Sequence, residues 1–198
     1  MNTAKKVLNI IRRITRDEDY KDLFFSDGEL LEKLTLAQNK LISEFKENIH
    51  YLTINTKGAQ ELELPYKIAY IIKLELDKKP LCYANATSAL KLKTPCFFHL
   101  RDKIYMITNA KGQDLEIMAC FFANELKSAN DSLALSPEFN KALALSVVLD
   151  ILLIERSTTD LQPRLQILRN ELEIAKNALR SLKNIANTPN VTYTKHHI

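Results

Sequence analysis

The apolar residues of this chain recur with one period towards its two ends and with another in its middle. Behind Ser26, one stripe of apolar side chains follows helical steps of three and four residues: Leu30, Leu34, Ala37, Leu41 and Phe45. From Tyr51 to Thr56 apolar and polar residues alternate instead, which is the period of a half-buried strand. The chain is therefore predicted to place strands between two helical ends.

The helices have recognisable starts. A basic helix is predicted from Thr3 to Thr15. Ser26-Asp27-Gly28-Glu29 forms a capping box, in which the Ser26 hydroxyl accepts from the Glu29 amide and the Glu29 carboxylate accepts from the Ser26 amide. The helix behind it is expected to end near Ile49. Ser136-Pro137-Glu138 opens a third helix with a serine cap, a proline at the first position and an acid in the first turn.

The third helix is predicted to be the central and most buried one, because residues 142–154 are apolar nearly all the way round. Asp150 interrupts this run. A buried carboxylate needs a partner, and either Arg156 or a basic residue of another helix or subunit is expected to supply it.

The fourth helix, predicted from about Asp160, has the most regular pattern in the chain. Its leucine seam alternates steps of four and three, as suits packing along another long helix: Leu161, Leu165, Leu168, Leu172, Leu179 and Leu182. Ile167 and Ile174 lie off this seam and are expected to make a second contact. The polar residues 187–198 that follow are interpreted either as a disordered tail or as an extended arm that pairs with a partner.

The middle of the chain is predicted to hold five or six short strands, at residues 51–56, 68–76, 81–83, 96–100, 104–108 and 115–122. The expected fold class is α+β but mainly α: a helical bundle of about four helices, with an inserted small antiparallel β module and an extended C-terminal arm. The predicted domains are residues 1–50 for the N-terminal helices, 51–123 for the β module, 124–186 for the C-terminal helices and 187–198 for the tail.

The sequence contains no recognisable catalytic or ligand-binding motif. The three glycines lie far apart, which excludes a loop that cradles phosphate. None of the four histidines stands at ligand spacing from a second ligand, and no two carboxylates stand out as acid and base. We therefore expect no enzyme activity, no cofactor and no metal. The three cysteines are expected to be small buried hydrophobes, kept reduced in a cytosol.

The charge distribution constrains partners only weakly. A net charge of +4 permits a nucleic-acid partner without arguing for one. Five basic residues lie on the polar side of the first helix, which is either an ordinary solvated face or a face towards DNA or a protein interface: Lys5, Lys6, Arg12, Arg13 and Arg16. The longest apolar run, residues 142–154, is too short to span a bilayer, so no membrane partner is expected.

Stretches spread over roughly residues 5 to 185 resemble a known family. They are residues 14–17, 25–31, 36–40, 74–81, 94–98 with 104–105, and 131–143, the last containing Ser136-Pro137-Glu138-Phe139. Together they are similar to the head-to-tail adaptor proteins of tailed bacteriophages, including the connector and tail tubular proteins of short-tailed phages.

The resemblance implies a structural virion protein at the head–tail junction, made in the host cytoplasm and assembled as a homo-oligomeric ring, typically of twelve copies. Its partners would be the portal protein, the tail or nozzle protein and neighbouring copies. DNA would cross the lumen without sequence-specific binding during genome retention and ejection. In this family a C-terminal arm commonly grips the portal, and that role would fall here on Pro189, Val191, Tyr193, Lys195 and Ile198.

Two other classes of function stay open at this point. The basic residues of the first helix also suit a small helical regulator that binds DNA without sequence preference. A small hydrolase whose site is too diffuse to recognise is the third reading, although nothing in the sequence selects a substrate.

Overall fold

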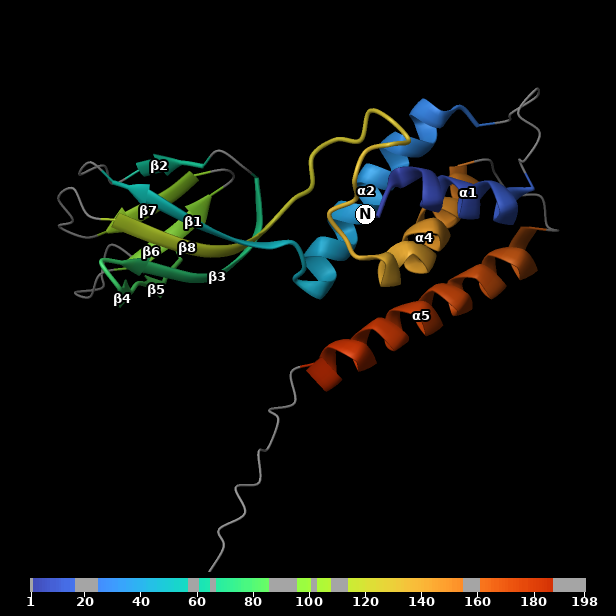
Figure 1. Ribbon diagram of the computed structural model, residues 1–198. Coiled ribbons are helices and arrows are strands. Elements are labelled where there is room, and N and C mark those ends of the chain that lie inside the picture. Colours follow the sequence, from blue (N-terminus) through green and yellow to red (C-terminus); the bar gives the residue numbers. More distant parts are fainter. Residues whose placement is uncertain are drawn as a thin grey trace, which may run out of the picture. The chain divides into compact units, whose positions relative to one another are not determined.

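The computed structural model describes residues 2–16, 25–56, 61–64, 67–85, 96–100, 103–107, 114–154 and 161–186. The chain divides into two compact units (Figure 1). A helical unit is formed by residues 1–37 and 126–198, and a strand unit by residues 38–125. The strand unit is thus an insertion between the two parts of the helical unit, and it begins and ends outside the range 51–123 that the sequence suggested.

Four α-helices are present among the described residues: α1 (Ala4–Thr15), α2 (Asp27–Phe45), α4 (Asn140–Ile154) and α5 (Leu161–Ala186), with a 3-10 turn η1 (Pro137–Phe139) before α4. The boundary between the units falls inside α2, after Ala37. In the helical unit, α4 packs against both α1 and α5. Residues 142–145, 147 and 148 are almost completely buried, so the prediction that this helix is the most buried one is confirmed.

Asp150 departs from its predicted surroundings. Its side chain is 54% exposed, so the expectation of a buried carboxylate is wrong. It does pair with a basic residue of another helix, since the Lys33 ammonium of α2 lies 3.0 Å from its Oδ2. Asp150 is therefore a solvent-facing position of α4, as are Lys141 and Leu153. A half-exposed ion pair of this kind stabilises the fold only slightly.

The start of α1 is capped by the loop before η1 rather than by its own N-cap, because Thr3 makes no side-chain cap hydrogen bond. The amides of Ala4 and Lys5 donate to the carbonyls of Asp131 and Ala129, at 2.9 and 2.7 Å. These bonds satisfy two of the backbone donors that every helix leaves open at its N-terminus. Because the partners come from the far side of the insertion, the bonds join the two parts of the helical unit.

Asn2 strengthens the same junction. Its side-chain amide nitrogen donates to the Leu135 carbonyl at 2.9 Å and to Asn140 Oδ1 at 2.8 Å, and the Asn140 amide donates back to Asn2 Oδ1 at 3.1 Å. The Asn2 carbonyl accepts from the Leu133 amide. Asn2 is buried, so each of its polar atoms needs such a partner.

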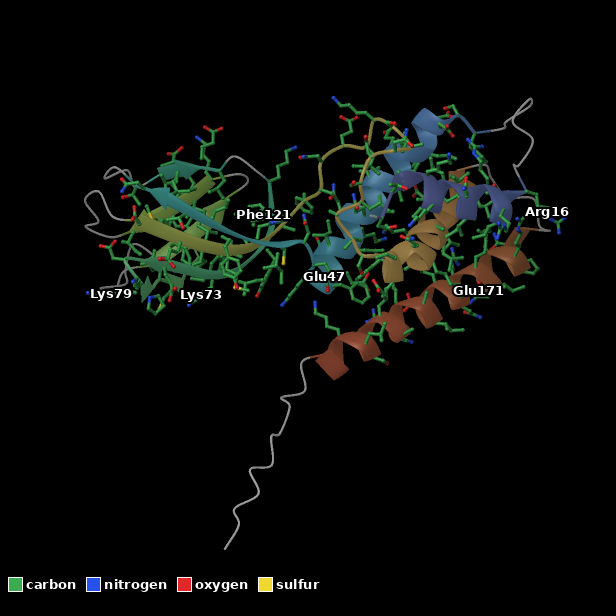
Figure 2. The ribbon with its side chains drawn as sticks, in the orientation of Figure 1. Arg16, Glu47, Lys73, Lys79, Phe121 and Glu171 are labelled. Carbon is green, nitrogen blue, oxygen red and sulfur yellow. The ribbon has the colours of Figure 1, made fainter. Side chains whose placement is uncertain are left out.

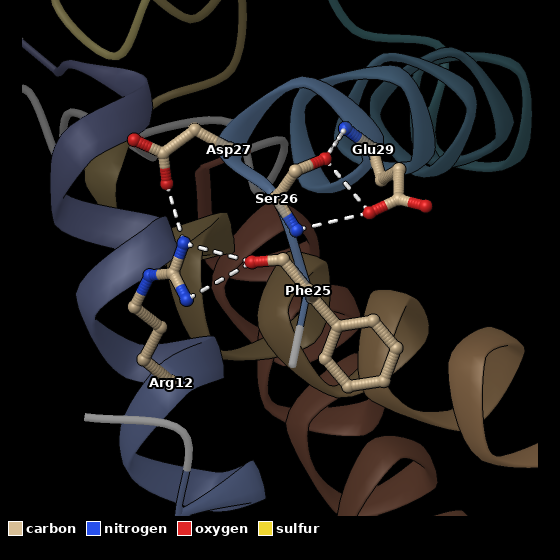
Figure 3. A network of polar contacts seen from close by, with 5 residues as sticks. All are labelled: Arg12, Phe25, Ser26, Asp27 and Glu29. Carbon is tan, nitrogen blue, oxygen red and sulfur yellow. Dashed lines mark hydrogen bonds and ion pairs between the residues drawn. The ribbon is translucent and has the colours of Figure 1, made fainter. Parts of the chain in front are cut away.

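Arg12 ties α1 to the start of α2 (Figure 3). Although it belongs to the basic face predicted from the sequence, it is buried, and both terminal nitrogens of its guanidinium donate to the Phe25 carbonyl at 3.3 Å. One of them also donates to Asp27 Oδ1. The planar guanidinium can hold a carbonyl and a carboxylate together because its donors point in fixed directions.

The predicted capping box at the start of α2 is confirmed. The Glu29 amide donates to Ser26 Oγ at 3.3 Å, and the Ser26 amide donates to Glu29 Oε2 at 2.9 Å. The hydroxyl of Ser26 donates to the same carboxylate oxygen, and this bond together with the backbone bond holds the pKa of Glu29 below its ordinary value.

The strand unit contains two four-stranded sheets. The first has the order β1 (Ile49–Asn55), β8 (Asp114–Phe121), β3 (Ile68–Leu76), β4 (Lys79–Pro80). The second has the order β2 (Glu61–Glu63), β7 (Lys103–Ile107), β6 (Cys96–Leu100), β5 (Cys82–Tyr83). One apolar core draws on both sheets, including Leu115, Ile117, Ala119 and Phe121 at alternate positions of β8 and Phe97, Ile104 and Met106 of the second sheet. The sheets therefore pack face to face as a sandwich.

The predicted fold class is wrong: it gave too small a share of strands, and it expected one small antiparallel module. The described residues form eight strands in two sheets, a sheet-rich α+β fold rather than a mainly helical bundle with a small β module. Nor is the module purely antiparallel, since β5 pairs parallel to β6, with Cys82 opposite Cys96. The strands β2 and β4 have three and two residues, too few to show a period. The long connection between β5 and β6 permits the crossover that a parallel pair needs.

Arg12→Ala is expected to destabilise the protein by about 2 kcal/mol, because it removes three hydrogen bonds and leaves the Phe25 carbonyl without this donor. Arg13→Ala is the matched control, since Arg13 is exposed in the same helix and the two substitutions change charge and helix propensity equally. It is expected to change stability by less than about 0.5 kcal/mol. Urea unfolding measures both, and equal effects would contradict the role of Arg12.

Asp131 makes the stability of the α1 cap depend on pH. Its Oδ2 accepts from the amides of Lys127 and Ser128, at 2.8 and 2.9 Å, and these bonds hold its pKa below the ordinary value. The stabilisation that the Asp131 carboxylate gives through these two bonds is therefore complete above the pKa of Asp131 in the unfolded chain. It is lost as the pH falls through the lower pKa of Asp131 in the folded protein. We expect wild type to be more stable than Asp131→Asn at neutral pH, with a difference that shrinks on acidification. Urea midpoints measured from pH 7 to pH 3 test this, and a constant difference would contradict it.

Candidate interaction surfaces

The exposed basic side chains of α1 form its cationic face, which consists of Lys5, Lys6, Arg13 and Arg16. The helix contains no acidic residue. Arg16, labelled in Figure 2, adopts the left-handed conformation that ends the helix. Arg164 of α5 adds another guanidinium at this end, where it donates to the Ile14 carbonyl at 2.8 Å. Cations at a helix C-terminus are stabilised by the helix dipole, so part of this charge has a structural role.

The leucine seam of α5 is buried over only part of its length. Leu165, Leu168 and Leu179 are buried and Leu172 is partly buried, whereas Leu182 is 54% exposed. The side chain of Leu161 lies outside the described residues. Beyond Leu172 the buried positions are Lys176 and Leu179, and Ala175 and Lys183 are partly buried. A strict heptad rotates by about 20° per seven residues against a straight helix, and this drift turns Leu182 outwards.

The outer face of α5 carries exposed apolar side chains: Ile167, Ile174 and Leu182. Ile174 is 66% exposed. Charged residues flank these positions, and two of them are paired: Glu171, labelled in Figure 2, lies 3.5 Å from Lys141, and Glu173 lies 3.9 Å from Arg180. An apolar stripe framed by charges is the composition of a protein interface rather than of an ordinary solvated helix.

The strand unit has a groove along one edge, which we call the β3 groove. Its volume is about 660 Å³, and it is lined by residues 69–74 of β3 together with Pro80, Leu81, Tyr83 and Phe97. Tyr83 is 68% exposed, and its ring meets Phe97 edge-on with the centroids 5.5 Å apart. Figure 2 labels Lys73 on β3 and Lys79 on β4, the two strands beside the groove.

The β3 groove was not predicted from the sequence. Tyr70 and Ile72 are exposed in a strand whose pairing with β8 is twice irregular, between Ile68 and Tyr70 and between Ile71 and Lys73. The available signal was the run Ile68-Ala69-Tyr70-Ile71-Ile72, which is apolar without strict alternation. Such a run does not reveal which side chains lie inside until the bulges are known.

Among the described residues, the ionisable groups whose pKa is shifted take part in ion pairs or in local hydrogen bonds to backbone and serine groups. The pKa of Lys73 is raised, mainly by its bond to Glu75, and the pKa of Lys103 by its bond to Glu61. No group of three metal-ligating side chains occurs within the ranges that the structure describes. Of the cysteines, Cys96 and Cys120 are buried as expected, whereas Cys82 is exposed and that expectation is wrong for it.

None of the helices in the described ranges combines the length and the apolar content that crossing a bilayer requires. The residues assigned to a portal-binding arm, Pro189, Val191, Tyr193, Lys195 and Ile198, lie outside the described residues. No protein-family model matches the chain, and no curated protein matches it in sequence.

Proposed function

We propose that this protein is a head-to-tail adaptor subunit of a tailed bacteriophage, a structural virion protein that forms a ring between the portal and the tail or nozzle protein. The observation that carries the proposal is the outer face of α5, with Ile167, Ile174 and Leu182 exposed on a helix whose opposite side is already packed. The resemblance of the sequence segments supplies the identity of the partners.

A closed ring constrains the contact surfaces of its subunit. Each copy must offer two different surfaces that fit one another, because a closed ring is built from head-to-tail contacts. The outer face of α5 offers one apolar surface of this kind. It runs along a helix of 26 residues, about 39 Å at 1.5 Å per residue, so a contact can extend over several helical turns.

The charge of the protein suits a ring through which DNA moves. The four exposed cations of α1 supply a positive face, and the whole chain carries a net charge of only +4. Each phosphate neutralised by a protein cation adds affinity and slows release, so a lumen that lets DNA slide must hold few such contacts. The function is therefore assembly followed by DNA passage, with no bond made or broken by the protein.

The test is assembly with the portal protein. The full chain mixed with its portal is expected to give rings that are visible by electron microscopy and by mass photometry. Ile167→Glu combined with Ile174→Glu is expected to abolish the rings without unfolding the protein, because both side chains are exposed. Leu36→Glu is the control, since Leu36 is equally exposed on another helix. A protein that stays monomeric with the portal present would overturn the proposal.

The cationic face of α1 favours a second candidate, a regulator that binds DNA without sequence preference. This function predicts strong binding to duplex DNA, with log K falling against log salt by up to about 0.9 per neutralised phosphate. Charge reversal at Lys5, Lys6, Arg13 and Arg16 is expected to abolish the binding, and Arg12 is left unchanged because it is buried. Fluorescence anisotropy at several salt concentrations measures both effects. Absence of binding at low salt excludes this candidate.

A further inference from the structure

Two of the three cysteines stand opposite each other in the second sheet. Cys82 of β5 pairs in register with Cys96 of β6, although residues 83–95 separate them in the sequence. Residues that are opposite each other in a ladder point their side chains to the same face of the sheet. The next pair in register, Tyr83 and Phe97, points to the other face, where Phe97 belongs to the sandwich core. The two cysteine side chains therefore share the face that is turned away from this core.

The spacing of the two strands suits a disulfide. Neighbouring strands lie about 4.8 Å apart, and the Cα atoms of disulfide-bonded cysteines lie roughly 4.4–6.8 Å apart. No disulfide joins the two residues in the structure. Strand β5 has only two residues and lies at the end of the strand order of its sheet. A small shift of β5 can therefore bring the two sulfurs into bonding distance without moving the longer strands β6 and β7.

The two cysteines differ in their access to solvent. Cys82 is exposed, whereas the side chain of Cys96 is completely buried. An oxidant in solution therefore reaches Cys82 first, and Cys96 is placed to react with the product. The third cysteine, Cys120, is buried on β8 of the first sheet, where it pairs with Ile49 and Tyr70. Cys120 is therefore a built-in control for oxidation that does not depend on strand pairing.

We propose that Cys82 and Cys96 form a disulfide when the protein meets a small disulfide oxidant such as oxidised glutathione. The Cys82 thiolate attacks one sulfur of the oxidant, which gives a mixed disulfide and releases one glutathione thiolate. The Cys96 thiolate then attacks the Cys82 sulfur and displaces the second glutathione thiolate. The two protein thiols are oxidised and lose two protons, which the two departing thiolates take up. In a reducing cytosol the pair stays as thiols, as expected for such compartments.

The bond would fasten a short edge strand. Strand β5 is joined to β6 by two residue pairs and by the Ala84 amide, which donates to the Phe97 carbonyl at 2.9 Å. Such an element, held by few contacts, opens locally more easily than the middle of a sheet. A disulfide closes the loop of residues 83–95 covalently, which lowers the entropy of the open and unfolded states.

The fastened strand also supplies part of the β3 groove. Tyr83 and Phe97, which follow the two cysteines directly in the sequence, both line this groove and meet edge-on. Oxidation is therefore expected to hold this part of the groove wall in place. Reduction leaves it held by hydrogen bonds and packing alone. The redox state of one cysteine pair thus controls the rigidity of the groove.

The first experiment incubates the full chain with mixtures of reduced and oxidised glutathione, followed by an acid quench, alkylation and peptide mass spectrometry. Wild type is expected to lose the Cys82 and Cys96 thiols together and to give one linked peptide pair, while Cys120 is alkylated in full. Cys96→Ala is expected to stop at a glutathione adduct on Cys82, and Cys120→Ala, the matched buried control, to behave as wild type. Wild-type protein that accumulates the adduct on Cys82, or that forms disulfide-linked dimers, would overturn the proposal.

The second experiment compares amide hydrogen exchange in the oxidised and reduced wild-type protein. Exchange in residues 82–84 is expected to slow on the order of tenfold on oxidation, while exchange in β1 is unchanged. Cys82→Ser, treated with the same oxidant, is expected to show no difference between the two conditions. Equal exchange in oxidised and reduced wild type would contradict the role of the bond in holding β5. Neither experiment involves the portal, so their results are independent of the proposed adaptor function.

Discussion

The insertion of residues 38–125 is the constraint on which the rest of the structure depends. It separates the two parts of the helical unit in the sequence, so residues near the N-terminus meet residues 129–140 across the insertion. The backbone bonds of Ala4 and Lys5 and the paired amides of Asn2 and Asn140 make this junction. The entropy lost in closing so long a loop grows only with the logarithm of its length, so a large insertion is tolerated once these contacts form.

The same arrangement divides the molecule's surfaces between two kinds of recognition. In the helical unit, α4 packs against α1 and α5, and three exposed apolar side chains lie on the outer side of α5, besides Leu36 of α2 and Leu153 of α4. In the strand unit, one apolar core joins the two sheets, and the β3 groove lies beside residues 69–74 of β3. One surface is an apolar helix face, and the other is a groove beside a strand. A subunit with both can make different contacts with different neighbours, as the proposed adaptor function requires.

Local patterns predicted those parts of the fold that depend on neighbouring residues in the sequence. Three features were predicted from the sequence: the capping box at Ser26, the buried run of α4 and the limits of β3. Each reflects side chains within a few positions of one another. The basic face predicted for the first helix is wrong at one residue. Arg12 was assigned to it, but its side chain is buried against Phe25 and Asp27. The prediction that Leu182 packs in the leucine seam of α5 is wrong, because a strict seven-residue repeat drifts around the surface of a straight helix.

By itself the sequence determined where the helices and the longer strands occur, because backbone periodicity selects which side chains share a face. Only the tertiary structure decided how the strands are shared between two sheets, that β5 runs parallel to β6, and that a groove lies beside β3. These features depend on pairing between residues that are well separated in the chain, such as Ile68 with Phe121 and Cys82 with Cys96. Strand partners are chosen by the packing of the whole core, and no single segment contains that information.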